Sequence, residues 1–232
     1  MMKIGIIGAM AVEVAALKEK LQNARTERAA NMEFSEGRLG ETEVVLVQSG
    51  VGKVNAALCV QLLVDRFHVT HVLNTGVAGS LNNDINIGDI VVSADALYHD
   101  VDAAVFGYQP GELPQMGILA FPADETLRSL AAASCRNAAP DIQVFEGRIA
   151  SGDQFISSRE KKNWIREMFH ADCTEMEGAA IAQAAWLNHI PFVIIRAISD
   201  KADESVAVSY DEFEAKAAVH CAQLVEQLIT SL

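Results

Sequence analysis

The most constraining feature of this chain is the apolar run at residues 190–200, IPFVIIRAISD, which ends abruptly in polar side chains. Uninterrupted runs rich in Val and Ile predict a strand that is buried on both faces of a sheet. In α/β proteins, the groups that carry chemistry gather just beyond the carboxyl ends of such strands. Because Arg196, Ser199 and Asp200 stand at that end, we expect a functional site there.

A second apolar segment precedes this strand. Residues 176–187 are apolar nearly all round, which predicts a helix packed deep inside the protein, yet this segment opens beside Glu175 and Glu177. If both glutamates are helical, they project to nearly opposite sides, and only one can easily face a given pocket. Acidic residues are also common at helix starts, so each glutamate is either a site residue or an ordinary helix-start acid.

The rest of the chain alternates strand and helix patterns. We expect strands at residues 3–8, 32–39, 43–48, 69–74, 90–97 and 143–150, and helices at 11–21, 52–64, 124–137 and 159–168. The strand at 69–74 is expected to break into the segment 75–79. A last helix is expected to begin at Ser209, with Glu212 completing a capping box.

This alternation predicts a three-layer α/β/α fold around a central mixed sheet. A chain of 232 residues fits one domain of this class, spanning 1–232. The Gly- and Pro-rich stretch 98–120 is long for a connection inside a compact domain, which indicates a functional loop or a contact surface.

Charge and hydropathy restrict the partners. The formal net charge of −13, without a cluster of Lys or Arg, argues against nucleic acid, which needs a basic face. The sequence has no leader pattern and no apolar run long enough to cross a bilayer. We therefore expect a cytoplasmic protein without a membrane partner.

Signals for a metal or a cofactor are weak. His68 and His71 are three apart in a strand-like segment, so they point to opposite faces. Gly5 and Gly8 lack the GxGxxG spacing of dinucleotide-binding proteins. The cysteines lack CxxC spacing and are expected to be buried, reduced thiols: Cys59, Cys135, Cys173 and Cys221. We expect neither a metal nor a cofactor.

Six short segments stand in order along the chain: GIIGAM at 5–10 with Glu13, SGVGK at 49–53, NTGVAG at 74–79, SGDQFI at 151–156, EME at 175–177 and RAISD at 196–200. Taken singly, Glu13 is also explained as a helix-dipole acid and Asp200 as a turn or capping residue. Together, the six segments resemble the motif set of bacterial 5′-methylthioadenosine/S-adenosylhomocysteine nucleosidases, within the purine nucleoside phosphorylase fold superfamily.

The resemblance implies catalytic roles for particular residues. Asp200 would be the general acid that protonates N7 of the adenine, with Ser199 helping to hold it. Glu13 would activate the attacking water, and Arg196 would assist near that water. Glu177 would bind the ribose hydroxyls.

The resemblance also implies a substrate pocket. Met176 would pack on the sugar, Phe155 would stack on the purine, and the backbone of Ile156 would read the purine edge. Part of the pocket for the 5′-alkylthio group would come from a neighbouring subunit, so a homodimer is implied, with the loop 106–114 at the interface. The residues of that apolar pocket would be Met10, Val51, Phe106, Tyr108, Pro114 and Tyr210.

The chemistry of N-glycosidic cleavage fits these roles. Positive charge builds on the sugar as the base departs, so the site needs an acid for the purine and a carboxylate for the water. We predict that Asp200 holds a proton when substrate is bound and that Glu13 is ionised at the moment of attack. Val77 departs from the family pattern, which often has a small hydroxyl residue there, and this affects how the water is positioned.

Other functions remain open on the sequence. A phosphorylase of the same fold would need a cationic phosphate cradle, but the loops carrying Met10 and Val77 have no arginine beside them, nor does the strand at 41–48 carry Lys or Arg. Hydrolases acting on AMP or futalosine are further alternatives. A non-catalytic nucleoside-binding protein could keep the fold, although such a protein has little use for both an acid and a base.

Overall fold

The computed structural model describes residues 2–230, with residues 206–212 and 214 described by their backbone alone. Within this range a ten-stranded mixed sheet has the order β10-β6-β8-β9-β5-β1-β4-β3-β2, and β7 pairs with β6. The strands are β1 (Lys3–Gly8), β2 (Gln22–Ala29), β3 (Met32–Leu39), β4 (Thr42–Gln48), β5 (His71–Ser80), β6 (Ile90–Tyr98), β7 (Phe121–Pro122), β8 (Val144–Ser151), β9 (Cys173–Glu175) and β10 (Phe192–Asp200). The helices are α1 (Ala11–Lys20), α2 (Lys53–Phe67), the short 3-10 helix η1 (Ala104–Phe106), α3 (Glu125–Ala138), α4 (Arg159–Phe169), α5 (Gly178–Leu187) and α6 (Val206–Thr230).

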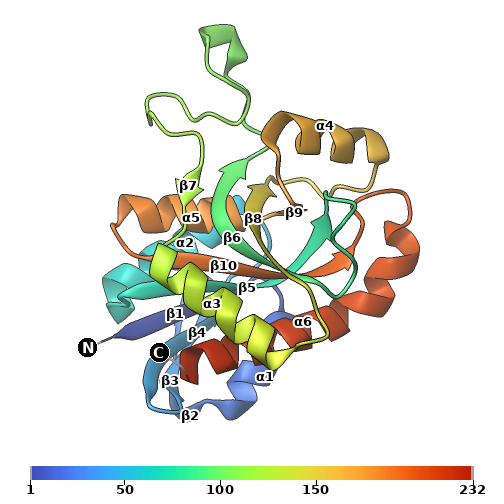
Figure 1. Cartoon of the computed structure of the whole chain (residues 1–232). Coiled ribbons are helices and arrows are strands. Elements are labelled where there is room, and N and C mark those ends of the chain that lie inside the picture. Colours follow the sequence, from blue (N-terminus) through green and yellow to red (C-terminus); the bar gives the residue numbers. More distant parts are fainter. Residues whose placement is uncertain (1, 231–232) are drawn as a thin grey trace.

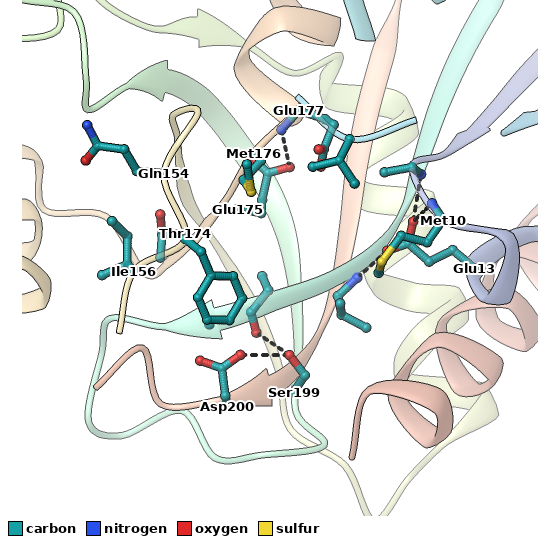
Figure 2. A pocket seen from close by; sticks show the side chains of 16 residues that line it. Met10, Glu13, Gln154, Ile156, Thr174, Glu175, Met176, Glu177, Ser199 and Asp200 are labelled. Atoms are coloured by element: carbon teal, nitrogen blue, oxygen red, sulfur yellow. Dashed lines mark hydrogen bonds between the residues drawn. The ribbon is translucent and has the colours of Figure 1, made fainter. Parts of the chain in front are cut away.

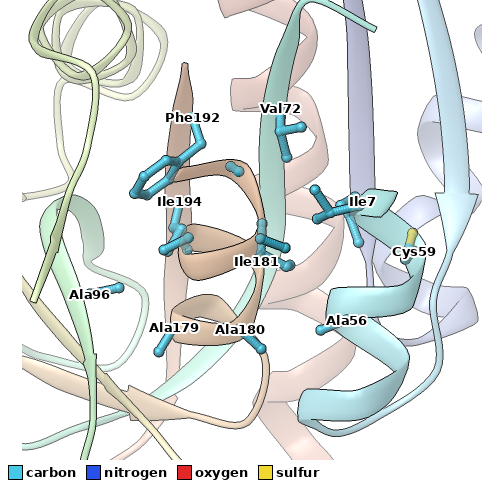
Figure 3. Close-up of a cluster of buried hydrophobic side chains, with 14 of the residues drawn as sticks. Ile7, Ala56, Cys59, Val72, Ala96, Ala179, Ala180, Ile181, Phe192 and Ile194 are labelled. Carbon is cyan, nitrogen blue, oxygen red and sulfur yellow. The ribbon is translucent and has the colours of Figure 1, made fainter. Parts of the chain in front are cut away.

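Apolar cores on both faces of the sheet produce three layers (Figure 1). Helices α2 and α5 cover one face, where Cys59 and Ile181 pack with Ile7 of β1 (Figure 3). Helices α1, α3 and α6 cover the other face, where Ile6 of β1 joins the core. Ile6 and Ile7, which are consecutive in β1, thus pack into the cores on opposite faces of the sheet, because successive side chains of a strand point to opposite faces. This arrangement confirms the predicted three-layer α/β/α fold with a central mixed sheet.

Part of the sheet closes on itself. Strand β5 pairs with β10 on one side and with β9 at its end, and the path β10-β6-β8-β9 leads back to β5. Strands β1, β5 and β10 are parallel, so their carboxyl ends meet at one edge of the sheet. Every residue of β10 is buried, as predicted for the apolar run that ends in Asp200.

Several element boundaries differ from the prediction, and each has a tertiary cause. Strand β5 continues through residues 75–79, because this segment pairs with β10 and then with β9. The edge strand β2 has almost entirely exposed, polar residues, so no apolar alternation indicates it, and pairing with β3 defines it. Helix α6 begins at Val206 and not at Ser209, and the side chains of the predicted capping box lie outside the described residues.

The long segment between β6 and β7 projects away from the body of the protein (Figure 1). It is irregular except for η1, and the side chains of Val105 and Phe106 are 87% and 79% exposed. Exposed apolar side chains on a projecting segment are typical of a contact surface. The geometry agrees with the expectation for residues 98–120.

Three further observations concern cysteines, metal ligands and membrane spans. All four cysteines are buried and free. Within the described residues, no group of three or more His, Cys, Asp or Glu side chains is arranged to hold a metal ion. None of the described helices combines the length and the apolar character that a membrane crossing requires.

Candidate active site

A pocket, about 570 Å³ when the open solvent at its mouth is included, lies at the edge where β1, β5 and β10 end (Figure 2). Segments following β8 and β9 complete its wall. Its position matches the rule that ligands bind outside the carboxyl ends of strands in α/β proteins. The described residues that line it are Ala9, Met10, Glu13, Val51, Val77, Ala78, Gly79, Gln154, Phe155, Ile156, Thr174, Glu175, Met176, Glu177, Ser199 and Asp200.

Glu13 is held by backbone N–H groups from two different strand ends. It is only 2% exposed. Its Oε2 accepts hydrogen bonds from the N–H groups of Ala9 and Met10, at 2.7 and 2.9 Å, and its Oε1 accepts one from Val77 at 3.1 Å. Burial raises the pKa of Glu13, while the charge of Arg196 and these backbone donors act against that rise. The donors stabilise the carboxylate form and fix its direction.

Asp200 has fewer hydrogen-bond donors than Glu13. It is 2% exposed, its Oδ1 accepts from the N–H of Ala202 at 2.7 Å, and its Oδ2 accepts from Oγ of Ser199 at 2.9 Å. Burial raises the pKa of Asp200, and the bonds from Ala202 and Ser199 offset only part of that rise. A carboxyl group in this setting is suited to carry a proton and donate it.

The two glutamates of the EME segment both line the pocket. Glu175 ends β9, and Glu177 is the N-cap residue of α5, so they do not share a helix. The expectation that only one of them can face a pocket is therefore wrong. Oε1 of Glu177 accepts from the N–H of Gly52 at 2.7 Å. Burial, followed by the nearby charge of Glu175, raises the pKa of Glu177 to about 7.

Arg196 lies beneath the pocket and does not line it. It is 1% exposed and forms a buried ion pair with Glu175, while a second guanidinium contact reaches Oδ1 of Asn74. Burial opposes the charge of Arg196, but the carboxylates of Glu175, Glu13 and Glu177 raise its pKa overall. Arg196 thus supplies a positive charge under a pocket whose lining is anionic.

Gly76 makes this arrangement possible. A Cβ atom at this position would lie 2.1 Å from Nη1 of Arg196 and 2.4 Å from Oε1 of Glu13, closer than any real contact allows. Only glycine therefore leaves room for the guanidinium and the carboxylate, which both lie where a side chain of residue 76 would begin.

Several residues of the pocket lining are apolar. Phe155 and Ile156 follow β8 and line the pocket together with Gln154, while Met10 and Met176 contribute thioether side chains. Figure 2 shows the ring of an aromatic side chain between Thr174 and Asp200. Flat apolar surfaces with a few polar groups are typical of pockets for small organic ligands.

Most residues predicted for the site come together in this lining: Met10, Glu13, Val51, Val77, Phe155, Ile156, Met176, Glu177, Ser199 and Asp200. Phe106, Tyr108 and Pro114 lie on the projecting segment and do not line the pocket of their own chain. The side chain of Tyr210 lies outside the described residues. The roles assigned to all of these residues stay predictions.

Comparison with known proteins identifies the family. A sequence profile described as the phosphorylase superfamily matches residues 3–230. A 5′-methylthioadenosine/S-adenosylhomocysteine nucleosidase of Geobacillus sp. (strain WCH70) is 44% identical over 232 residues, covering 100% of this chain and 99% of the relative. The chain belongs to this nucleosidase family.

Solved structures of such proteins share the fold over the whole chain. The nucleosidase of Colwellia psychrerythraea 34H, in complex with adenine, superimposes with a TM-score of 0.95 at 43% identity, covering 100% of this chain and 96% of that one. A futalosine hydrolase of Helicobacter pylori strain 26695 gives a TM-score of 0.94 at 34% identity, covering 100% and 98%. Members of the nucleosidase family and a futalosine hydrolase therefore share one architecture with this chain.

Some lining residues could not be found by sequence reasoning. Gln154 lies within the SGDQFI segment but was given no role, and Thr174 had no distinctive local pattern. The buried Oγ1 of Thr174 has no hydrogen-bond partner among the described residues. Glu175 could be recognised as unusual but not as the buried partner of Arg196. The only sequence signal for Glu175 was the EME segment, in which two glutamates flank a methionine next to an apolar helix.

Proposed function

We propose that this chain hydrolyses the N-glycosidic bond of 5′-methylthioadenosine and S-adenosylhomocysteine, and also of 5′-deoxyadenosine, releasing adenine and the 5-substituted ribose. The observation that carries the proposal is one pocket holding two buried carboxyl groups in different settings, Glu13 in the first turn of α1 and Asp200 at the end of β10. Family membership supports the substrate class.

The proposed mechanism uses the two carboxyl groups in opposite protonation states. Asp200 donates its proton to N7 of the purine as the bond to the sugar lengthens, and Ser199 holds its carboxyl group in place. Glu13, ionised, takes a proton from water as that water attacks the sugar carbon. Glu177 accepts hydrogen bonds from the ribose hydroxyls, and Arg196 stabilises the anionic groups around the reacting water.

The binding part of the proposal uses the apolar wall. Phe155 stacks on the purine, the backbone of Ile156 contacts its edge, and Met176 packs on the sugar. Met10, Val51 and Val77 surround the 5′ substituent. The backbone N–H of Val77 supports Glu13, so a side-chain hydroxyl at this position is not needed to hold the carboxylate.

Hydrolysis is favoured over phosphorolysis by the charge of the pocket. The described lining includes the carboxyl groups of Glu13, Glu175 and Glu177, besides Asp200, which is protonated in the proposed mechanism, and it contains neither Lys nor Arg. A phosphate ion, or the phosphate of AMP, would have to enter beside buried carboxylates, which like-charge repulsion disfavours. Water carries no such cost.

The function is tested by incubating the purified protein with 5′-methylthioadenosine, with and without phosphate, and identifying the products by mass. Adenine with free methylthioribose in phosphate-free buffer is the expected result. A sugar 1-phosphate formed only with phosphate would instead make the protein a phosphorylase. Parallel incubations with S-adenosylhomocysteine, 5′-deoxyadenosine, futalosine and AMP define the substrate range, and no cleavage of any of them would favour a nucleoside-binding protein.

We also propose that the protein is a homodimer in the cytoplasm, with a partner subunit supplying Phe106, Tyr108 and Pro114 to the pocket. Apolar side chains are exposed at the pocket residue Val51, on α2, at the C-terminal end of α5 and on the projecting segment: Val51, Val54, Leu58, Val105, Phe106, Trp186 and Leu187. Analytical ultracentrifugation of the purified chain tests the dimer, and replacement of the exposed Val54 by Asp should shift it toward monomer. A wild-type monomer that retains full activity would contradict this assembly.

A further inference from the structure

The chain segment that follows Asp200 is fastened to the first turns of α4. Nζ of Lys162 donates a hydrogen bond to the backbone carbonyl of Lys201 at 2.7 Å and lies 3.8 Å from Oδ2 of Asp203. The backbone N–H of Arg159 donates to Oε1 of Glu204 at 3.0 Å. These contacts hold residues 201–204 against α4, directly beyond the end of β10.

Lys162 is buried to a degree that is rare for lysine. It is only 4% exposed, and lysine is almost never fully buried unless it is paired. Burial lowers the pKa of Lys162, and the charge of Asp203 acts in the opposite direction. Keeping an ammonium group inside the protein costs free energy. Lys162 is therefore not an ordinary solvent-exposed lysine, and its burial needs a structural reason.

A small apolar cluster lies alongside these polar contacts and joins two walls of the pocket. It contains Ile156, Ile165 and Ala202. Ile156 lines the pocket, Ile165 belongs to α4, and Ala202 donates the hydrogen bond that holds Oδ1 of Asp200. Helix α4 therefore packs at once against the wall that carries Ile156 and against the segment that carries Asp200.

We propose that Lys162 is a positioning residue for the general acid: it ties residues 201–204 to α4 and so holds Asp200 in place relative to the purine wall. The proposal rests on the acid role proposed above for Asp200. Lys162 is not among the described residues that line the pocket, so it acts through Asp200 and not on the substrate.

The charges around the contact between Lys162 and residues 201–204 predict in which direction the pH profile should move when one of them is removed. Of the charged groups that act on Asp200, Asp203 raises its pKa and Lys162 lowers it. Lys162 itself faces Asp203, Lys201, Arg159 and Asp200. Because the acid must be protonated, kcat falls as the pH rises through its pKa. Loss of the Lys162 charge should therefore move the alkaline limb of kcat to higher pH, and loss of the Asp203 charge should move it to lower pH.

The experiment measures kcat and KM for release of adenine from 5′-methylthioadenosine as a function of pH. Lys162→Met keeps the length of the side chain but removes the ammonium group, and Lys162→Arg restores a charge. We expect Lys162→Met to lower kcat roughly ten- to a hundredfold with a smaller change in KM, and to shift the alkaline limb upward by on the order of one pH unit. Lys162→Arg should recover most of both effects.

Lys161→Met is the matched control, because the Lys161 ammonium lies 4.2 Å from the centre of the Trp164 ring and has no described contact with residues 201–204. It should behave like the wild type. A Lys162→Met protein with wild-type kcat and an unshifted pH profile would overturn the positioning role. Absence of adenine release by the wild type would overturn the proposed function instead.

If Lys162→Met does not fold, Asp203→Asn carries the test. A shift of its alkaline limb to lower pH supports the coupling of this contact to Asp200. An alkaline limb at the wild-type position would show that the charges on residues 162 and 203 do not reach the acid, and would overturn the proposal.

Discussion

The two ends of the pocket hold the same kind of functional group in different surroundings. Glu13 accepts three backbone hydrogen bonds, from Ala9, Met10 and Val77, and lies near the charge of Arg196. Asp200 accepts one backbone hydrogen bond, from Ala202, and one from a hydroxyl group. Both are almost completely buried.

In the proposed mechanism, this difference separates the base, Glu13, from the acid, Asp200. Desolvation raises the pKa of both groups, so burial alone cannot distinguish them. What differs is the number of fixed N–H donors and the weight of the nearby cation: Arg196 is the main group that lowers the pKa of Glu13, whereas Lys162 has the least effect of the groups that act on Asp200. Both differences favour the ionised form at Glu13. Pairs of carboxyl groups whose environments differ in this way are typical of enzymes that need general acid and base together.

The largest expected effect comes from removing either group. Asp200→Asn and Glu13→Gln should each lower kcat for adenine release by about a hundred- to ten-thousand-fold, because each removes a positioned proton transfer. The two losses should differ in pH dependence, since Glu13 must be ionised and governs the acidic limb, whereas Asp200 must be protonated and governs the alkaline limb. Stopped assays over a pH series measure both. Near-normal turnover of either variant would invalidate its assignment.

The second prediction concerns Arg196, the buried cation near Glu13. Glu175→Gln leaves the buried guanidinium of Arg196 without its closest anionic partner, and breaking a buried pair in this way costs roughly 3–5 kcal/mol of unfolding free energy. Urea denaturation measures the loss. Glu33→Gln, which removes an exposed carboxylate paired with Lys18 and Arg28, is the matched control and should change stability far less. Equal effects of the two variants would mean that the buried pair is not important for stability.

The third prediction concerns Glu177, which lines the same pocket as Glu13 and Asp200. Its pKa rises from 4.5 to about 7 on folding, so between these values the folded chain binds a proton that the unfolded chain has released. Unfolding free energy should therefore decrease as the pH rises through this window, by roughly 3 kcal/mol at most. Glu177→Gln should remove this part of the pH dependence. Denaturation curves at both ends of the window give the change of unfolding free energy with pH. The same change in the wild type and in Glu177→Gln would contradict the pKa shift.

The smallest expected effect comes from Ser199→Ala, which takes one of the two donors from Asp200. Loss of one hydrogen bond to a carboxylate costs about 1–3 kcal/mol and disfavours ionisation, so the alkaline limb of kcat should move to higher pH. We expect kcat itself to fall by about tenfold or less. An alkaline limb that moves to lower pH would show that the hydroxyl group stabilises the protonated form.

Much of the fold could be predicted because the pattern of apolar residues along the sequence indicates which segments are buried. The run ending in Asp200 is buried throughout, as its composition requires. Strand β2 could not be predicted, since an exposed edge strand has no apolar face and depends on its partner. Residues 75–79 were expected to leave the sheet because their glycines weaken a strand in isolation, but neighbouring strands on both sides retain them.

The sequence by itself determined the fold class and the family motifs, because these depend on residue type and spacing, and the resemblance carried by those motifs pointed to Glu13, Glu177 and Asp200. Only the tertiary structure decided which groups surround each carboxylate. The donors to Glu13 come from residues 9, 10 and 77, and they converge because β1 and β5 pair in parallel with a fixed register. The partner of Arg196 is likewise set by the meeting of β9 with β5 beside β10. Hydrogen-bond direction and desolvation depend on such long-range contacts, which local sequence does not encode.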